Sequence, residues 1–465
     1  MKKINLGQKD YIHFVGIGGI GMSGLAQIMK NMGFKVQGSD QGKNKNTISC
    51  TKSGIKVFIG HSTANIKQAT IVVKSTAIKK NNIELKYAVK NKIPIYSRAE
   101  ILADVVSLKK NIIITGSHGK TTTTSLVAKI LSDQKLDPTI INGGVINSIK
   151  SNAKLGKGDW AILEADESDG SFLKLPINYS IVTNIDYEHL DYYKNYKNLE
   201  KSFIEFINKT PPTGKAIICI DNKNVKKILN KIKNKNILTY GENKIAEYQV
   251  KKIRYNFEST KFNINFKDKD KKVKKINNIN VKLLGKHNVL NATAALIVCL
   301  NLGADLKKAK KSLKNFSGVQ RRMTKVFSKN KNDFYDDYAH HPTEIESILD
   351  GVHNVNAKRK IISVFEPHRY SRVLSLKNEF SKCFSKSSLV IMCPLYAAGE
   401  SKNLKFNSIN FANLIAKNSK TQVIIVNSEE ELKKYFKKNL IKDEIIIGMG
   451  AGSISKWMLG LKSSL

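Results

Sequence analysis

Cysteine is scarce in this chain, with five residues among 465. They are Cys50, Cys219, Cys299, Cys383 and Cys393, and no two of them form a CxxC pair. This spacing excludes a disulfide framework and the usual zinc sites, because both need clustered cysteines. We therefore expect reduced, buried cysteines and a cytoplasmic protein.

Long apolar runs are also missing. A membrane-spanning helix needs about 20 consecutive apolar residues, and no segment of the sequence provides them. The N-terminus carries Lys2 and Lys3, but no apolar stretch of roughly 7–15 residues follows them, as a secretory signal requires. The sequence predicts neither a membrane partner nor a signal peptide.

Acidic residues are few relative to basic ones. The chain has 38 Asp and Glu against 79 Lys and Arg, a formal net charge of +41. Such an excess in general favours nucleic-acid binding. Here the basic residues are almost all lysines scattered among Asn and Ile, which AT-rich codons also specify, and they lack the aromatic interleaving of single-strand binders. We therefore expect no nucleic-acid partner.

Arginine is rare enough to be informative. It stands only at positions 98, 254, 321, 322, 359, 369 and 372. Where lysine is the default cation, arginine is expected at places where its planar fork binds a carboxylate or phosphate through two hydrogen bonds. The pairs Arg321/Arg322 and Arg369/Arg372 are therefore candidate anion-binding residues.

Residues 112–124, IIITGSHGKTTTT, form the strongest motif. An apolar strand-like run precedes the glycines, and a helical pattern follows them. Glycines let the backbone approach a phosphate, a lysine adds charge, and a threonine hydroxyl can bind Mg²⁺. The spacer between the glycines is shorter than in the Walker pattern. The motif predicts a nucleotide-binding phosphate loop made of Gly116, Ser117, His118, Gly119, Lys120, Thr121 and Thr122.

Two acidic clusters follow apolar runs downstream of this loop. Residues 160–163 and 180–183 read as strands, and the polar residues after them are Glu164, Asp166, Glu167 and Asp169, then Asp186, Glu188, His189 and Asp191. Parallel strands place their carboxyl ends at one edge of a sheet, so both clusters should lie beside Lys120. Carboxylates there usually hold Mg²⁺, and the position of His189 among them favours a metal or phosphate role.

A second glycine-rich turn lies near the N-terminus, at Gly16, Gly18, Gly19 and Gly21. A strand is predicted over 11–15 before it and another over 34–38, which runs into Ser39 and Asp40. The helix between them ends at Gly33 and has an apolar face formed by Leu25, Ile28, Met29 and Met32. This βαβ pattern indicates a diphosphate or dinucleotide on the helix end.

The last third of the chain predicts another parallel α/β sheet. Strands are expected over 333–338, 361–365, 389–393, 423–426 and 445–447, with helices between them. The first two run into DDYAHHP (336–342) and EPHRYSR (366–372), and a glycine turn lies at 448–453. Histidine and arginine at strand ends suit a carboxylate substrate, so the two segments are candidate carboxylate-binding segments.

The length suggests roughly three domains of about 150 residues each. We expect an α/β protein with a Rossmann-like domain at 1–108, a central P-loop ATPase-type domain at 109–315 and a Rossmann-like C-terminal domain at 316–465. Within the central domain, the alternating residues 240–281 predict antiparallel strands or a surface excursion. The helix predicted over 292–300 begins near Asn288 and Asn291, which could cap it or meet a nucleotide base.

Together the motifs resemble those of the Mur ligases of bacterial peptidoglycan synthesis. The resemblance covers essentially the whole chain and rests on HFVGIGGIGMSGLA (13–26), TGSHGKTTTT (115–124), EADESDGSFL (164–173), TNIDYEHLDYY (183–193), LLGKHNVLNATAA (283–295), GVQRRM (318–323), DDYAHHPTEI (336–345), EPHRYSR (366–372) and YAAGE (396–400). The short phosphate loop is the form that this family uses. The resemblance implies an ATP- and Mg²⁺-dependent ligase that joins a carboxylate to an amine through an acyl phosphate.

The motifs are most similar to the branch of the family that adds L-alanine to UDP-N-acetylmuramate, which implies these two molecules as substrates. The resemblance implies a UDP-sugar site made of Gly16, Gly18, Gly19, Gly21, Ser39, Asp40 and Ser75. It gives catalytic roles to Lys120, Glu164, His189 and His340, and metal-binding roles to Thr121, Glu164 and His189. Asn288, Asn291 and Arg321 would meet the nucleotide, and His340, Arg369 and Arg372 would bind the amino acid.

Some positions depart from the family pattern. Ser117 stands where Thr is frequent, Glu188 where Asp is usual and Met323 where Phe is common. Three other interpretations stay open: a recycling ligase that joins a murein tripeptide to the same UDP-sugar, an NAD-dependent oxidoreductase, and a basic P-loop protein that acts on nucleic acid. The second leaves Lys120, Glu164 and His189 unexplained. We expect a monomer or a weak homodimer.

Overall fold

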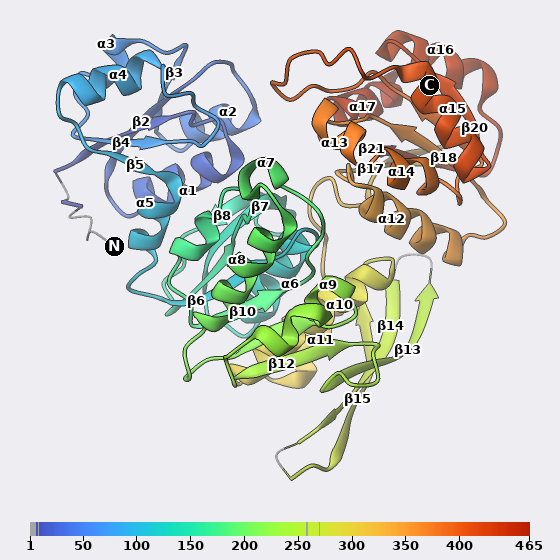
Figure 1. Cartoon of the computed structure of the whole chain (residues 1–465), viewed down its shortest axis with the longest axis horizontal. Helices are drawn as coiled ribbons and strands as arrows, with labels where there is room; N and C mark the ends of the chain where they lie inside the picture. The colour runs from blue at the N-terminus through green and yellow to red at the C-terminus, as the bar shows by residue number, and fades with distance from the viewer. Residues whose placement is uncertain (1–5, 8, 257–258, 269) are drawn as a thin grey trace. The chain divides into compact units, whose positions relative to one another are not determined.

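A computed structural model describes residues 6–7, 9–256, 259–268 and 270–465, and their strands form sheets of five, ten and six strands (Figure 1). The described chain forms two compact units. The second unit comprises residues 318–465 together with 253–261 and 282–289, and the rest of the chain up to 317 belongs to the first. The five-stranded sheet and most of the ten-stranded one therefore belong to a single unit.

The first sheet is parallel throughout and consists, in sheet order, of β3 (Lys56–Ile59), β2 (Lys35–Asp40), β1 (Tyr11–Val15), β4 (Ile71–Lys74) and β5 (Ile95–Ser97). Its helices are α1 (Ile20–Asn31), α2 (Lys45–Lys52), α3 (Thr63–Ile66), α4 (Ile83–Lys90) and α5 (Arg98–Val105). The glycine-rich turn joins the central strand β1 to α1. It lies where the strand order reverses, which is the usual ligand position in such sheets.

The apolar face expected for α1 is present except at its last position. Leu25, Ile28 and Met29 are buried, but Met32 is 40% exposed because the helix ends at Asn31, one residue before it. The prediction for Met32 is therefore wrong. Gly33 follows in the left-handed region, with φ of +96°, and turns the chain toward β2.

A buried polar cluster lies beneath the glycine-rich turn. The Glu84 carboxylate accepts hydrogen bonds from Ser39 Oγ at 2.5 Å and from Asn65 Nδ2 at 2.8 Å, and the His13 and His61 rings lie within 3.3 Å of it. Burial alone would raise the pKa of Glu84, but the hydrogen bonds from His13, Ser39 and Asn65 lower it to about 2. The cluster thus joins β1, β2, α4 and the segment after β3.

We expect the Glu84 carboxylate to make the chain acid-labile. A carboxyl group with a lowered pKa contributes stability that is fully present above its unfolded pKa, near 4.5, and is lost as the pH falls toward 2. The contribution is about 3 kcal/mol at neutral pH. A Glu84→Gln variant should have a lower melting temperature at pH 7, and the difference from the wild type should shrink as the pH falls through this window. A difference that is constant with pH would contradict this origin.

The ten-stranded sheet consists, in sheet order, of β15 (Val273–Val281), β14 (Ser259–Lys267), β13 (Tyr248–Asn256), β12 (Ile237–Gly241), β11 (Ala216–Cys219), β10 (Tyr179–Val182), β6 (Lys110–Thr115), β9 (Trp160–Glu164), β7 (Thr139–Ile146) and β8 (Ser151–Lys154). Its helices are α6 (Lys120–Asp133), α7 (Leu190–Tyr193), α8 (Tyr196–Asn208), α9 (Lys223–Ile228), α10 (Lys286–Asn301) and α11 (Leu306–Lys314), with short 3₁₀ turns at Ser171–Lys174 and Leu229–Lys231. The strands β9, β6 and β10 are parallel neighbours at the middle of the sheet. Their carboxyl ends therefore share one edge.

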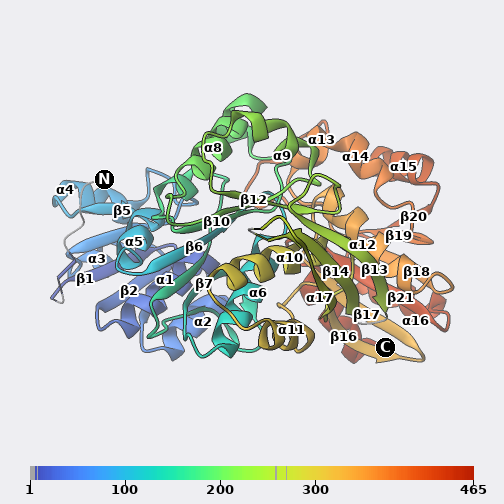
Figure 2. The ribbon, with the colours of Figure 1, turned by 90° about the horizontal axis from the view of Figure 1, so that it is seen from below.

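One part of this sheet was predicted from the sequence, and another was not. Strands β13, β14 and β15 are sheet neighbours in chain order, and their connections are too short for a parallel crossover, which agrees with the antiparallel prediction for most of 240–281. The prediction is wrong at its start, because Tyr240 and Gly241 belong to β12, which pairs with β13 in parallel. The hairpin β7–β8 was not predicted. It lies beside α1 of the first sheet (Figure 1, Figure 2).

The six-stranded sheet consists, in sheet order, of β16 (Thr324–Lys329), β17 (Asn332–Asp337), β21 (Glu444–Met449), β18 (Lys360–Phe365), β19 (Leu389–Met392) and β20 (Gln422–Ile425). Its helices are α12 (Pro342–Val355), α13 (Tyr370–Ser375), α14 (Lys377–Lys382), α15 (Ser408–Ser419), α16 (Glu429–Asn439) and α17 (Ile454–Ser464). All five predicted strands are present and parallel. The edge strand β16, antiparallel to β17, was not predicted.

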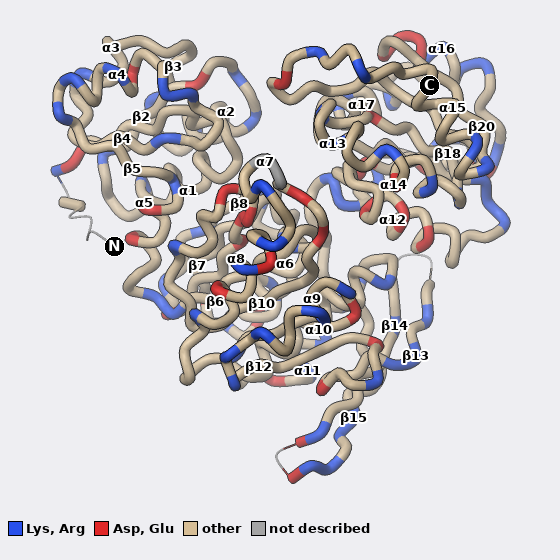
Figure 3. Tube along the Cα trace, in the orientation of Figure 1, with Lys and Arg blue, Asp and Glu red and all other residues tan. Residues whose placement is uncertain are grey.

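The expectation for the cysteines is confirmed. All five cysteines are free and buried. Among the described residues, no helix is long and apolar enough to cross a membrane. Lysine and arginine are spread along every part of the trace rather than gathered in one segment (Figure 3).

Candidate active site

The phosphate loop joins β6 to α6. Gly116 and Gly119 adopt φ of +133° and +82°, which L side chains rarely adopt. A Cβ atom on Gly116 would also collide with Thr183 Oγ1, and one on Gly119 would lie 2.6 Å from Asn291 Oδ1. Both glycines are therefore required by conformation and by space. Thr122, 6% exposed, follows in the first turn of α6.

The segment after β10 fixes the shape of this loop. The Thr183 hydroxyl donates to the His118 carbonyl at 2.6 Å, and the His118 amide donates to Asn184 Oδ1 at 2.8 Å. Ser117 Oγ accepts from the Asp186 amide at 2.8 Å. The phosphate loop is thus held by its neighbouring strand before any ligand arrives, a preorganised arrangement.

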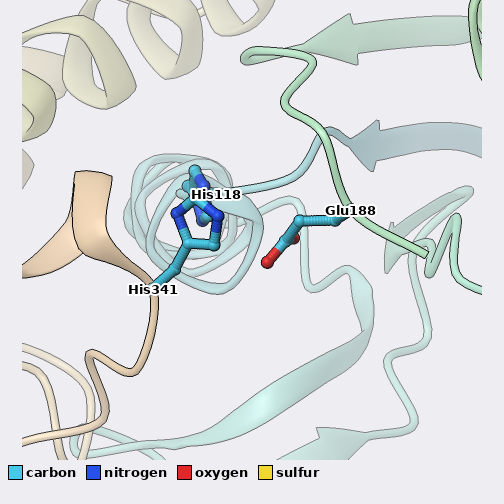
Figure 4. Close-up of side chains that lie close together, drawn as sticks. All are labelled: His118, Glu188 and His341. Carbon is cyan, nitrogen blue, oxygen red and sulfur yellow. The ribbon is translucent and has the colours of Figure 1, made fainter. Parts of the chain in front are cut away.

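His118 points its ring toward the same segment. Its Nε2 lies 2.9 Å from Asp186 Oδ2. The Glu188 carboxylate is turned toward the His118 side, within 4.8 Å of a ring nitrogen (Figure 4). These contacts give the side chain of His118 an acidic environment next to the loop.

Lys120 is the first residue of α6, and its ammonium group is bound on two sides. Nζ donates to the Gly116 carbonyl at 2.5 Å and contacts Glu167 Oε2 at 2.8 Å and Oε1 at 3.1 Å. Burial alone would lower the pKa of Lys120, but the charge of Glu167, itself 1% exposed, raises it above its ordinary range. Lys120 is therefore a fixed positive charge at the phosphate loop.

Thr121 and Glu164 form the first candidate magnesium site. The Thr121 hydroxyl donates to Glu164 Oε1 at 3.0 Å, and the Gly143 amide donates to Glu164 Oε2 at 2.5 Å. A Cβ atom on Gly143 would lie 2.5 Å from Glu164 Oε1, so this carboxylate needs a glycine beside it. Hydroxyl and carboxylate oxygens are the ligands that Mg²⁺ prefers, and the pair fits that ion.

Asp166, Glu167 and His189 form a second group with metal-ligand character. One ligand atom of each lies within 4.8 Å of the others. His189 adopts φ of +58°, and its Nε2 lies 3.5 Å from Glu167 Oε1. Burial alone would lower the pKa of His189, but the contact with Glu167 raises it. A metal ion there would displace the imidazole proton, and the oxygen-rich set suits a hard cation.

The N-terminal glycine turn is tied to the end of β2. The Ser39 carbonyl accepts from the amides of Gly16 and Ile17 at 2.9 and 3.0 Å, and Asp40 Oδ2 accepts from the Gly18 amide at 2.8 Å. Gly16 has φ of +84°, and a Cβ on it would meet Ser75 at 3.1 Å. The predicted residues Gly16, Gly18, Ser39, Asp40 and Ser75 therefore lie together.

Two members of this predicted set have another orientation or setting. The Ser39 hydroxyl points into the domain and donates to Glu84, so only its backbone faces the turn. Gly21 lies in α1, where a Cβ would be 3.0 Å from Arg98 Nη1. Gly19 caps α1 without a side-chain hydrogen bond, which leaves the helix start open to a ligand.

The two asparagines predicted to meet the nucleotide differ in their contacts. Asn291 lies on α10 with its side-chain amide against Gly119 of the phosphate loop. Asn288, one turn earlier, donates to the Leu284 carbonyl at 2.7 Å and contacts His287 Nε2 at 3.0 Å. Asn291 thus belongs to the surroundings of the loop, whereas the Asn288 amide is used within its own segment.

The second unit gathers a group of histidines and arginines at the ends of β17 and β18. Arg372 Nη1 lies 3.1 Å from His368 Nδ1, and the His340 and His368 rings are 5.4 Å apart. Arg369 adopts φ of +67°, and its Nε is buried without a hydrogen-bond partner among the described residues. Burial, and then the charges of His340, Arg372 and Arg369, lower the pKa of His368 to about 3. An anion would relieve this accumulation of positive charge.

Arg321 and the glycine turn near the C-terminus meet on the same edge of that sheet. Arg321 Nη2 donates to the Gly450 carbonyl at 2.6 Å, and its guanidinium lies 4.8 Å from the Tyr338 ring centroid. The buried Glu366 carboxylate accepts from the amides of Gly452 and Ser453, each at 2.8 Å. Glu366 therefore fills the start of α17, and this turn is not open to a phosphate.

Sequence reasoning did not single out several residues that complete these sites. They are Gly143, Asn184, Glu366 and His368. Glu366 belongs to a motif that was recognised, but the motif does not say what this carboxylate binds. Likewise, the acidic cluster that contains Glu167 was expected beside Lys120, but the sequence does not say which of its carboxylates contacts the lysine. Gly143 lies within β7, a strand that was not predicted, and only its position in the sheet gives it a role.

The chain matches three family profiles. The profile "Mur ligase family, catalytic domain" matches residues 11–110, "Mur ligase middle domain" matches 114–299, and "Mur ligase, glutamate ligase domain" matches 321–452. Together they cover most of the chain.

Relatives and solved structures agree with these profiles. The chain is 53% identical to a UDP-N-acetylmuramate–L-alanine ligase of Pelagibacter ubique and 40% identical to one of Brucella anthropi, over 98% of this chain and 98% and 97% of theirs. Its fold matches the UDP-N-acetylmuramate-alanine ligase of Thermotoga maritima with a TM-score of 0.83 and 28% identity, over 98% of both chains. A murein peptide ligase of Psychrobacter arcticus shares the fold with a TM-score of 0.71 and 22% identity, again over 98% of both.

Proposed function

The chain belongs to the Mur ligase family, and we propose from this premise that it is the ATP-dependent ligase that joins L-alanine to the carboxylate of UDP-N-acetylmuramate in peptidoglycan precursor synthesis. The observation that carries the assignment is the full-length similarity to ligases of that specificity. We place the reaction in the cytoplasm, and through the cell wall it serves cell shape and division.

Each of the three segments has its own substrate in this proposal. Residues 1–108 bind UDP-N-acetylmuramate at the glycine turn, where the open start of α1 and the Asp40 carboxylate suit a diphosphate and a ribose. Residues 109–315 bind ATP at the phosphate loop. Residues 316–465 bind L-alanine, with Arg369 and Arg372 as partners for its carboxylate and His340 beside them.

The first chemical step transfers the γ-phosphate of ATP to the muramate carboxylate, which gives that poor acyl donor a leaving group. Lys120 neutralises charge on the transferred phosphate from its fixed place at the loop. Thr121 and Glu164 would hold one Mg²⁺, and His189 with Glu167 a second. Bound Mg²⁺ would supply charge neutralisation between nucleotide and carboxylate. The nucleotide would be met by Asn291. It would also be met by Asn288 and Arg321, once these two side chains have given up their present contacts.

The second step is attack of the L-alanine amine on the acyl phosphate, through a tetrahedral intermediate that collapses to amide and phosphate. Positioning dominates this step, because the amine and the acyl carbon must meet in a fixed geometry. The preformed cation group of the second unit provides a carboxylate anchor, supported by the buried Arg369 Nε. The His368 ring, with Nδ1 3.1 Å from Arg372 Nη1, helps to hold that guanidinium in place.

Phosphate release from ATP tests the assignment. The full-length protein is incubated with Mg²⁺, UDP-N-acetylmuramate and, separately, L-alanine, glycine, L-serine or a murein tripeptide. We expect release with L-alanine and little without an amine. Release with the tripeptide alone would instead establish the recycling ligase, and release stimulated by DNA would point to a nucleic-acid enzyme. A methyl or hydroxyl is worth about 1–3 kcal/mol, so glycine and L-serine should be slower substrates.

Arg372→Lys is expected to weaken catalysis because an ammonium group cannot reproduce the planar fork that binds a carboxylate. We expect kcat/KM for L-alanine to fall about 10- to 100-fold, the equivalent of one charged hydrogen bond. The matched control is Arg254→Lys on β13, where the arginine is exposed. Equal kinetics in the two variants would contradict the role of Arg372.

A further inference from the structure

The β7–β8 hairpin (Thr139–Lys154) contacts both nucleotide-type sites of the first unit. From β8, the Asn152 side chain donates from Nδ2 to the Ile20 carbonyl at 2.7 Å, in the first turn of α1. From the neighbouring strand β7, the Gly143 amide donates to Glu164 Oε2 at 2.5 Å. One short element therefore touches the start of the UDP-sugar helix and the metal-binding carboxylate.

The contact with α1 is close and largely buried. Asn152 is 6% exposed, and a Cβ atom on Gly24 of α1 would lie 2.8 Å from Asn152 Nδ2 and 3.0 Å from Ala153 Cβ. Leu25 of α1 and Ala153 of β8 belong to the same buried apolar cluster. The hairpin and the helix are thus packed as one body, and the small residue at Gly24 is what allows the approach.

The hairpin is also joined to the helix of the phosphate loop. Asn142 Nδ2, next to Gly143, donates to Ser125 Oγ of α6 at 2.9 Å and to the Gly144 carbonyl at 3.0 Å. Ser125 in turn donates to the Thr121 carbonyl at 2.7 Å. A shift of β7 would therefore also move both candidate magnesium ligands, Thr121 and Glu164.

We propose that Asn152 is a positioning residue for the UDP-sugar site, and that the β7–β8 hairpin couples the binding of the UDP-sugar to the binding of magnesium nucleotide. The proposal rests on the proposed function, because it takes UDP-N-acetylmuramate and ATP as the ligands of the two sites. A ligand that fixes the first turn of α1 fixes Asn152, and through the hairpin it fixes the Gly143 amide and the Glu164 carboxylate. By linkage, the effect is the same in the opposite direction.

Titration calorimetry on the full chain tests this coupling. The dissociation constant of UDP-N-acetylmuramate is measured with and without Mg²⁺ and a non-hydrolysable ATP analogue, in the absence of an amine. In the wild type we expect the nucleotide to tighten UDP-sugar binding about fivefold or more. In Asn152→Asp, which keeps the size but replaces the donor by a carboxylate facing a carbonyl oxygen, the UDP-sugar should bind about tenfold more weakly. In this variant, adding the nucleotide should change the dissociation constant of UDP-N-acetylmuramate by less than about twofold.

Two further variants separate coupling from a loss of fold. Gly24→Ala approaches the same contact from α1, favours the helix itself, and should reduce the coupling in the same way as Asn152→Asp. Asn147→Asp is the matched control, because this residue lies on the same hairpin but donates to the Ser317 carbonyl at 2.7 Å. It should keep both the affinity and the coupling of the wild type.

The outcomes distinguish this inference from the proposed function. A wild type that releases phosphate with L-alanine, but whose UDP-sugar affinity does not respond to nucleotide, would overturn the coupling alone. An unchanged coupling ratio in both Asn152→Asp and Gly24→Ala, even with lowered melting temperatures, would also overturn it. A wild type that neither binds UDP-N-acetylmuramate nor releases phosphate with L-alanine would overturn the proposed function itself.

Discussion

Lys120→Ala is expected to lower kcat for phosphate release by about 10³-fold or more, the effect of removing a preorganised group that stabilises charge in the transition state. The ammonium group is fixed between the Gly116 carbonyl and Glu167, so no reorganisation is needed when phosphate charge develops. Affinity for nucleotide should fall less than kcat, since the loop amides and the start of α6 still bind the phosphates.

The same substitution should also destabilise the first unit. Glu167 is 1% exposed and depends on Lys120 for its counter-charge, and removing one partner of a buried pair costs about 3–5 kcal/mol. The matched control is Lys129→Ala on the same helix, where the lysine pairs with Asp133 one turn away. Such a helical pair contributes about 0.5 kcal/mol or less. Activity and melting temperature near those of the wild type in Lys120→Ala would contradict the role of this lysine.

The sequence predicted most of the strands that are continuous apolar runs. Residues 112–115 and 361–365 lie between covering helices, and burial on both faces leaves a run of Ile and Val that is easy to recognise. The strands β3, β7, β8, β11 and β16 were not predicted. Strands β3, β8 and β16 are short and lie at sheet edges, whereas β11 is a buried run of four residues, AIIC, that we did not predict. The sequence of β7, TIINGGVI, contains two glycines, and its exposed middle shows no alternation.

The sequence predicted which motifs form the candidate site, but it did not predict which side chains contact each other there. The phosphate loop, the acidic clusters and the arginine pairs stand at strand ends, and the rule for parallel sheets places them on one edge. Which acid meets which base depends on side-chain direction after the strand ends. Glu164 is the last residue of β9 and points to Thr121, whereas Glu167, three residues later in an irregular segment, turns back to Lys120. No periodicity applies there.

Glu167→Gln is expected to reduce kcat about 10²-fold or more, with its largest effect at low Mg²⁺. The amide has the shape of the carboxylate but neither its charge nor its second acceptor oxygen. Lys120 would lose its ion pair, and the group formed by Asp166, Glu167 and His189 would lose one carboxylate ligand. Activity should therefore be partly restored by raising the Mg²⁺ concentration, which a purely structural defect would not show.

The pH dependence separates the charge of Glu167 from its size. Glu167 raises the pKa of His189, so the pair contributes stability that is complete below the ordinary histidine pKa of 6.5 and is lost as the pH rises through the raised value. In Glu167→Gln this loss between neutral and alkaline pH should disappear from the melting temperature. The matched control is Asp169→Asn in the same segment, where the carboxylate accepts from the Ser171 amide at 2.9 Å. It should keep the wild-type Mg²⁺ response and pH profile, and an equal response in both variants would show that Glu167 acts only through the fold of the segment.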